Sequence, residues 1–100
     1  MELPVKQISG LLKVLANENR LLILCELMKG PRTVGAIGEK IHGITQSALS
    51  QHLALLKAHG ILDCKKMGMN VIYAIGDRRV EEVIAVLKIH FCSDEKENTQ

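Results

Sequence analysis

The spacing of apolar residues changes twice along this 100-residue chain, and the order of the changes limits the folds that it can adopt. Apolar residues recur at helical spacing in four segments before residue 60, alternate in two short runs between residues 61 and 75, and then return to helical spacing. The letters MGMN at 67–70 are typical of a hairpin turn. We therefore expect a mainly α fold with a small β-hairpin, in the order four helices, hairpin, fifth helix.

Turn and capping residues predict where these helices begin and end. Pro4 can open the first helix, in which the spacing of Val5, Ile8, Leu12 and Leu15 predicts one buried stripe. Asn17 interrupts that pattern, and the second helix is apolar at nearly every position from residue 21 to 27, which predicts burial on most sides. Gly30 and Pro31 end the second helix. Thr33, Thr45 and Asp77 can cap the third, fourth and fifth helices, and Gly60 ends the fourth.

Composition favours one domain filled by aliphatic side chains. Hydrophobic residues make up 47% of the chain, but there are only one Tyr, one Phe and no Trp. We place a single domain at residues 1–92 and a flexible acidic tail at 93–100, whose three acidic and one basic residues leave the domain with a net charge of +4. A short, apolar chain of this kind often covers part of its surface with a second copy, so we expect a homodimer.

Several classes of protein are disfavoured. No apolar run approaches the roughly 20 residues of a membrane span, and the N-terminus lacks the pattern of a signal peptide, so we expect a cytoplasmic protein that does not bind a membrane. The three cysteines form no C-x-x-C pair that would support a zinc ribbon or a thioredoxin-type site. No nucleophile lies beside a recognisable base, and no phosphate loop occurs. We expect neither an enzyme nor a bound cofactor.

The segment TQSALSQHLALLKAHG at 45–60 predicts a helix with two different faces. Leu49, Leu53 and Leu56 share one face, while short Ser and Gln side chains share the other, and no acidic residue occurs from residue 46 to 54. Base edges in the DNA major groove are read by compact donors and acceptors near a helix N-terminus. A Ser and Gln face can also simply be solvated. Its place after a helix-turn and before a basic hairpin favours DNA recognition.

Two helices joined by a tight turn and followed by a hairpin form a winged helix-turn-helix. Lysines at the end of the fourth helix and in the hairpin are suited to phosphate contacts. His52 lies at the rim of the apolar face, where packing or a phosphate contact is favoured over base recognition. The predicted DNA-binding residues are Gln46, Ser47, Ser50, Gln51, His52, Lys57, Lys65 and Lys66.

The stretches VLANENRLLILCEL, TVGAIGEKI, TQSALSQHLALLKAHGIL and VIYAI resemble the ArsR family of bacterial winged-helix repressors, over most of residues 11–92. The resemblance implies a homodimer built on the first and last helices, a palindromic operator on double-stranded DNA, and a chemical inducer. The interface residues that we expect on this basis are Leu12, Val80, Val83, Ile84, Leu87 and Phe91.

The metal sites that the resemblance implies are incomplete here. The third helix has no cysteine, which removes one type of site. The positions of a second type, on the last helix, hold Asp77, Arg79, His90 and Ser93. Arg79 would place a permanent cation among the ligands, whereas divalent metals need several neutral or anionic donors. We interpret Asp77 as a helix cap and His90 as a surface residue, and expect no metal.

Cys25 and Cys92 match the two positions of the sulfide- and persulfide-responsive ArsR members, the BigR and YgaV group, and of HlyU-type regulators. The resemblance implies that a persulfide donor or oxidant modifies one thiol and that the other resolves it into a bridge. Cys25 could instead be a small, buried filler with a raised pKa. Cys64 is outside the pair. A metal-responsive repressor, and a winged helix used only for protein contacts, remain the alternatives.

Overall fold

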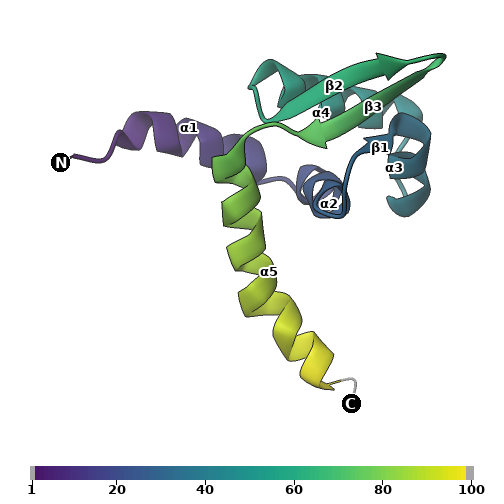
Figure 1. The fold of residues 1–100 in the computed structure, drawn as a ribbon. Helices are drawn as coiled ribbons and strands as arrows, with labels where there is room; N and C mark the ends of the chain where they lie inside the picture. Colours follow the sequence, from purple (N-terminus) through teal and green to yellow (C-terminus); the bar gives the residue numbers. More distant parts are fainter. Residues whose placement is uncertain (1, 99–100) are drawn as a thin grey trace.

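The computed structural model describes the backbone of residues 2–98 and the side chains of residues 2–92. Its helices and strands follow the predicted order of four helices, a hairpin and a fifth helix (Figure 1). The elements are α1 (Val5–Leu15), α2 (Glu18–Leu27), β1 (Arg32–Thr33), α3 (Val34–Lys40), α4 (Gln46–Ala58), β2 (Leu62–Met67), β3 (Asn70–Ile75) and α5 (Arg78–Asn98).

Side chains cap four of the helices. Thr33 and Thr45 each accept a hydrogen bond from the backbone N–H three residues further on, at 3.1 and 3.0 Å, and so satisfy donors that have no partner within α3 and α4. Asp77 accepts from the backbone N–H of Arg79 at 2.9 Å. These three predicted caps are confirmed. Asn17, predicted only as an interruption, caps α2 in the same way.

The hairpin belongs to a three-stranded antiparallel sheet in the order β1-β3-β2. Met67 pairs with Asn70, which closes a two-residue turn, and Gly68 at its first position has a φ of +63°, a backbone conformation that favours glycine. The edge strand β1 has only two residues, too few for an alternating pattern, and the sequence did not predict it. The hairpin extends beyond the helices as a wing (Figure 1).

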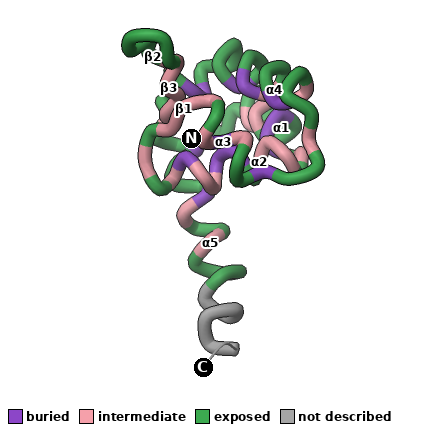
Figure 2. Tube along the Cα trace, turned by 90° about the vertical axis from the view of Figure 1, so that its right-hand side faces the viewer, coloured by how far each residue is buried: buried purple, intermediate pink, exposed green. Residues whose placement is uncertain are grey.

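The core lies where α2, α3 and α4 meet the end of α1, the start of β2 and the start of α5, and Figure 2 shows buried segments in these helices. Among the described residues, no polar or charged side chain is buried, so the centre is wholly aliphatic. The buried side chains are Val14, Leu15, Ile23, Leu24, Leu27, Ile37, Ile41, Leu49, Leu53, Leu56, Ile61, Leu62, Val80 and Ile84.

The stripe predicted for α1 is not buried in the single chain. Only its last member, Leu15, is buried, whereas Val5 is 67% and Leu12 51% exposed. The first half of α1 extends away from the body of the molecule, so helical spacing identified an apolar face that the described part of the chain covers only in part (Figure 1).

Helix α5 also extends away from the body, and only its first two turns contribute to the core (Figures 1 and 2). It continues to Asn98, past the predicted domain boundary at residue 92. The predicted flexibility of the tail falls mostly outside the residues whose side chains are described. Within residues 2–98, no helix is long and apolar enough to cross a membrane.

Candidate nucleic-acid interface and thiol pair

Helix α4 has the two faces that its sequence predicts. Leu49, Leu53 and Leu56 are between 0% and 3% exposed and hold the helix against the core. The four short polar side chains predicted to read bases lie in its first two turns and are all exposed: Gln46, Ser47, Ser50 and Gln51. The arrangement leaves compact hydrogen-bonding groups on the solvent side at the N-terminal end of a firmly packed helix.

A close approach between α3 and α4 fixes the helix-turn-helix. A Cβ added at Gly38 would lie 3.4 Å from Leu49 Cδ2, so the glycine that weakens α3 as an isolated helix lets α4 pack closely against it. Between the two helices, Gly43 has a φ of +79°. The turn therefore brings Thr45 to the start of α4, where it caps the helix.

Three lysines are exposed near this surface. Lys65 and Lys66 lie on β2 in the wing, and Lys57 lies in the last turn of α4. The Cys64 side chain on β2 raises the pKa of Lys57. The structure thus places positive charge at the C-terminal end of α4 itself and on β2 in the wing.

His52 is half-buried on α4, and its Nδ1 lies 3.3 Å from a guanidinium nitrogen of Arg20. Arg20 lies on α2, and the sequence analysis did not single it out. The two residues are 32 positions apart, so no local pattern could have paired them.

The two cysteines predicted to act as a pair lie on different helices, Cys25 on α2 and Cys92 on α5. All three cysteines are free; Cys25 is half-buried and Cys92 is exposed. Burial raises the pKa of the Cys25 thiol, the Lys88 ammonium opposes that rise, and a charge on Cys92 adds to it. Cys25 and Cys92 therefore lie close enough for a charge on one to act on the other. Lys88 lies one turn before Cys92 on α5, and its effect on Cys25 was not predicted from the sequence.

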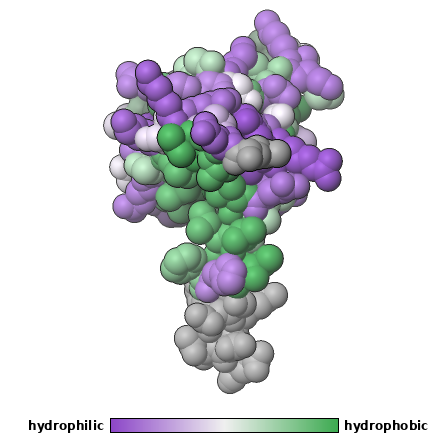
Figure 3. All heavy atoms as spheres, turned by 90° about the vertical axis from the view of Figure 1, so that its left-hand side faces the viewer, coloured by the Kyte–Doolittle hydropathy of each residue, from purple (hydrophilic) through white to green (hydrophobic). Residues whose placement is uncertain are grey.

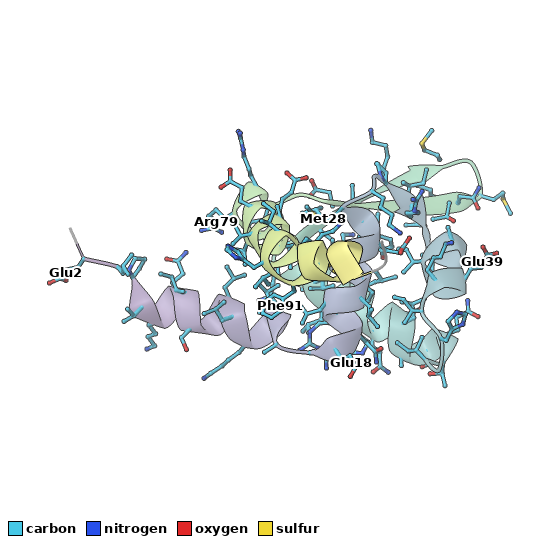
Figure 4. All side chains as sticks on the ribbon, turned by 90° about the horizontal axis from the view of Figure 1, so that it is seen from below. Glu2, Glu18, Met28, Glu39, Arg79 and Phe91 are labelled. Atoms are coloured by element: carbon cyan, nitrogen blue, oxygen red, sulfur yellow. The ribbon has the colours of Figure 1, made fainter. Side chains whose placement is uncertain are left out.

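The Asp77 carboxylate at the start of α5 is bound by the Arg79 side chain. Two hydrogen bonds join the Arg79 guanidinium to the carboxylate, at 3.1 and 2.8 Å, and this contact lowers the pKa of Asp77. Figure 4 shows Arg79 at this end of α5. In the part of the chain with described side chains, no three His, Cys, Asp or Glu residues are grouped as metal ligands would be. Ser93 lies outside that part.

The residues predicted at a dimer interface divide into two groups. Leu12, Val83, Leu87 and Phe91 are exposed, with Phe91 at 72%. Figure 3 shows apolar side chains gathered from the body down the described part of α5, and Figure 4 shows Phe91 on that helix. Val80 and Ile84, by contrast, are 0% and 1% exposed within the single chain. The interface assignment of these last two needs correction, because they face inward at the base of α5 and belong to the core.

The order of elements, the packed α4 and the projecting hairpin define a winged helix-turn-helix. The model of the bacterial regulatory protein arsR family matches residues 17–63. The transcriptional regulator YgaV of Escherichia coli is 35% identical over 92% of this chain and 93% of its own length. The chain belongs to the arsR family, as its resemblance predicted, and is a transcriptional regulator with a DNA-binding winged helix.

Two solved structures support the same fold. The structure of HlyU from Vibrio cholerae matches with a TM-score of 0.84 and 37% identity, over 92% of this chain and 99% of that one. The HlyU of this species is described as a transcriptional activator. A homodimeric winged helix-turn-helix DNA-binding domain, Mb0332 from Mycobacterium bovis, matches with a TM-score of 0.75 and 29% identity, over 96% and 86% of the two chains.

Proposed function

We propose that this chain is a homodimeric repressor that recognises a palindromic operator with α4 and releases it when Cys25 and Cys92 become linked. The observation that carries the DNA-binding part is the division of α4 into a buried leucine face and an exposed Ser and Gln face. Gln can bond an adenine edge with two hydrogen bonds, and Ser can bond bases or phosphates. The wing lysines and Lys57 then neutralise phosphates beside the groove.

A second copy would cover the apolar surfaces of α1 and α5. Leu12, Leu87 and Phe91 expose large apolar side chains that the single chain leaves in water. The homodimeric state of Mb0332 supports this assignment, because that domain has the same fold over most of both chains. In a two-fold dimer the two α4 helices would enter successive major grooves on one side of the duplex.

The thiol switch begins at Cys92, because its exposed thiol is accessible to a donor. A Cys92 thiolate attacks the central sulfur of an organic trisulfide R–S–S–S–R, one of its S–S bonds breaks, and the departure of R–S⁻ leaves Cys92 as the mixed trisulfide Cys92–S–S–S–R. The Cys25 thiolate then attacks the sulfur chain now bound to Cys92 and displaces the second thiolate or persulfide, which leaves a di- or trisulfide between α2 and α5. Since α5 belongs to the expected dimer interface, a bridge between Cys25 and Cys92 would shift the spacing of the two α4 helices.

Treatment of the reduced protein with an organic trisulfide should weaken operator binding by roughly 5- to 150-fold, the usual range of coupling between two sites. Fluorescence anisotropy with labelled operator measures the affinity, and peptide mass spectrometry of the same sample identifies the bridge. Cys64 is half-buried, as Cys25 is, but it is not part of the proposed pair. The Cys64→Ser variant should therefore respond to the trisulfide like the wild type. Cys25→Ser should keep the donor on Cys92 and retain full affinity.

The raised pKa of Cys25 also sets the pH dependence of the second step. Only the thiolate attacks, and its fraction increases about tenfold for each pH unit below the pKa. Once the Cys92 adduct has formed, the bridge should therefore close faster as the pH rises through the neutral range. A fully bridged protein with unchanged operator affinity would refute the thiol switch, and tight zinc binding that releases DNA would favour a metal inducer instead.

A further inference from the structure

One arginine side chain connects three helices of the chain. Arg20 begins on α2, where its backbone N–H is bound by the Asn17 cap at 3.0 Å. Its Nε donates to the carbonyl oxygen of Val14 at 2.6 Å, in the last turn of α1, where helix carbonyls lack partners within the helix. Its guanidinium also reaches Nδ1 of His52 on α4 at 3.3 Å.

The contact with Arg20 determines which nitrogen of His52 carries the proton. A guanidinium has five donors, no acceptor, and remains charged at all relevant pH values. The Nδ1 atom of His52 must therefore be the acceptor, which places the proton of the neutral ring on Nε2. Arg20 thus fixes both the tautomer and the orientation of this imidazole.

The other edge of the ring is free to meet a ligand. Nε2 lies across the imidazole from the Arg20 contact. Among the described side chains, Glu26 Oε1 is the one buried polar atom without a hydrogen-bond partner, so Nε2 is not an unsatisfied buried group. No hydrogen bond to Nε2 occurs within the described part of the chain, and solvent therefore reaches it. His52 immediately follows Gln51, one of the exposed residues of the predicted DNA face.

We infer that Arg20 is a positioning residue for DNA binding: it holds His52 so that Nε2–H donates a hydrogen bond to a DNA phosphate. The inference rests on the proposed DNA-binding role of α4 and adds a named phosphate contact to it. Because the donor is a neutral imidazole, the contact supplies affinity without releasing a counterion. Through Val14 the same arginine ties the recognition helix to α1, a helix of the expected dimer.

The first test is a measurement on the free protein. Nitrogen-15 NMR of the neutral His52 ring should show protonation at Nε2 in the wild type. Arg20→Lys keeps the positive charge but lacks the planar fork that contacts Val14 and His52 together, so it should give a mixture of tautomers. Protonation at Nδ1 in the wild type would overturn the inference, and this outcome does not depend on any variant folding.

The second test is operator binding in a double-mutant cycle. His52→Ala should weaken binding about tenfold or more per protomer, the scale of one hydrogen bond to a charged group, with an unchanged slope of affinity against salt. Arg20→Lys should weaken binding in the wild-type background and have no further effect on His52→Ala. Lys57→Ala serves as the contrast, because loss of a charged phosphate contact lowers that salt slope by about 0.9 per protomer.

Independent, multiplying effects of Arg20→Lys and His52→Ala would also overturn the inference, because Arg20 would then act by another route. Failure of the proposed function has a different signature. If the chain binds no operator, neither substitution changes DNA affinity, yet the NMR result still reports whether Arg20 sets the tautomer. The two failures are therefore distinguishable in one set of samples.

Discussion

Replacing Gln46, Ser47 and Gln51 together with Ala should reduce operator binding to the level of non-specific DNA. Each well-made base contact discriminates by about 1–3 kcal/mol, so losing the group removes most of the advantage of the operator over random sequence. The fold should persist, because all three side chains are exposed and the leucines on the opposite face remain buried. Anisotropy titrations against the operator and a scrambled duplex measure the loss, and thermal unfolding checks the fold.

A matched control uses the same residue types on another surface. Gln7→Ala with Ser9→Ala removes exposed Gln and Ser side chains from α1 and should leave the preference for the operator intact. The salt dependence of the triple variant should also persist, because Lys57, Lys65 and Lys66 remain. Full operator affinity in the triple variant would contradict DNA recognition by α4 and favour a winged helix used for protein contacts.

Leu87→Glu combined with Phe91→Glu should convert the protein to a folded monomer and lower operator affinity by about 100-fold or more. Both side chains are exposed in the single chain, at 41% and 72%, so charge there does not enter the core. In a dimer the same charges would be buried without partners. A monomer loses the second, effectively intramolecular half-site contact, which contributes roughly 10²- to 10⁴-fold in linked binders.

Sedimentation velocity measures the oligomeric state of this double variant, and anisotropy measures its operator affinity. Met69→Glu is the control for the oligomeric state, since Met69 is 97% exposed but lies at the tip of the wing. It should sediment like the wild type. A double variant that remains dimeric would place the interface elsewhere on the molecule.

Local chemistry explains which parts of the fold the sequence could predict. Thr33, Thr45 and Asp77 cap helices through hydrogen bonds to residues two or three positions away, so the signal and the structure lie in the same short segment. The faces of α4 follow in the same way from the spacing of Leu49 and its neighbours. These features need no knowledge of what packs against them.

Features that depend on distant partners could not be predicted. Helical spacing marks an apolar face but does not say which molecule covers it, and this explains both the exposed Leu12 and the buried Val80. The pairing of β1 with β3 involves two residues, below the length at which alternation is detectable. The contact between Arg20 and His52 depends on tertiary packing alone.

The most direct test of the central claim, a symmetric dimer that reads DNA with α4, is selection of bound sequences from a pool of random duplexes. The reduced wild-type protein should enrich an inverted repeat whose half-site centres lie about one helical turn, roughly 10 to 10.5 base pairs, or a multiple of it, apart. The triple α4 variant should enrich nothing. Enrichment of a single half-site without symmetry, or no enrichment by the wild type, would contradict the account.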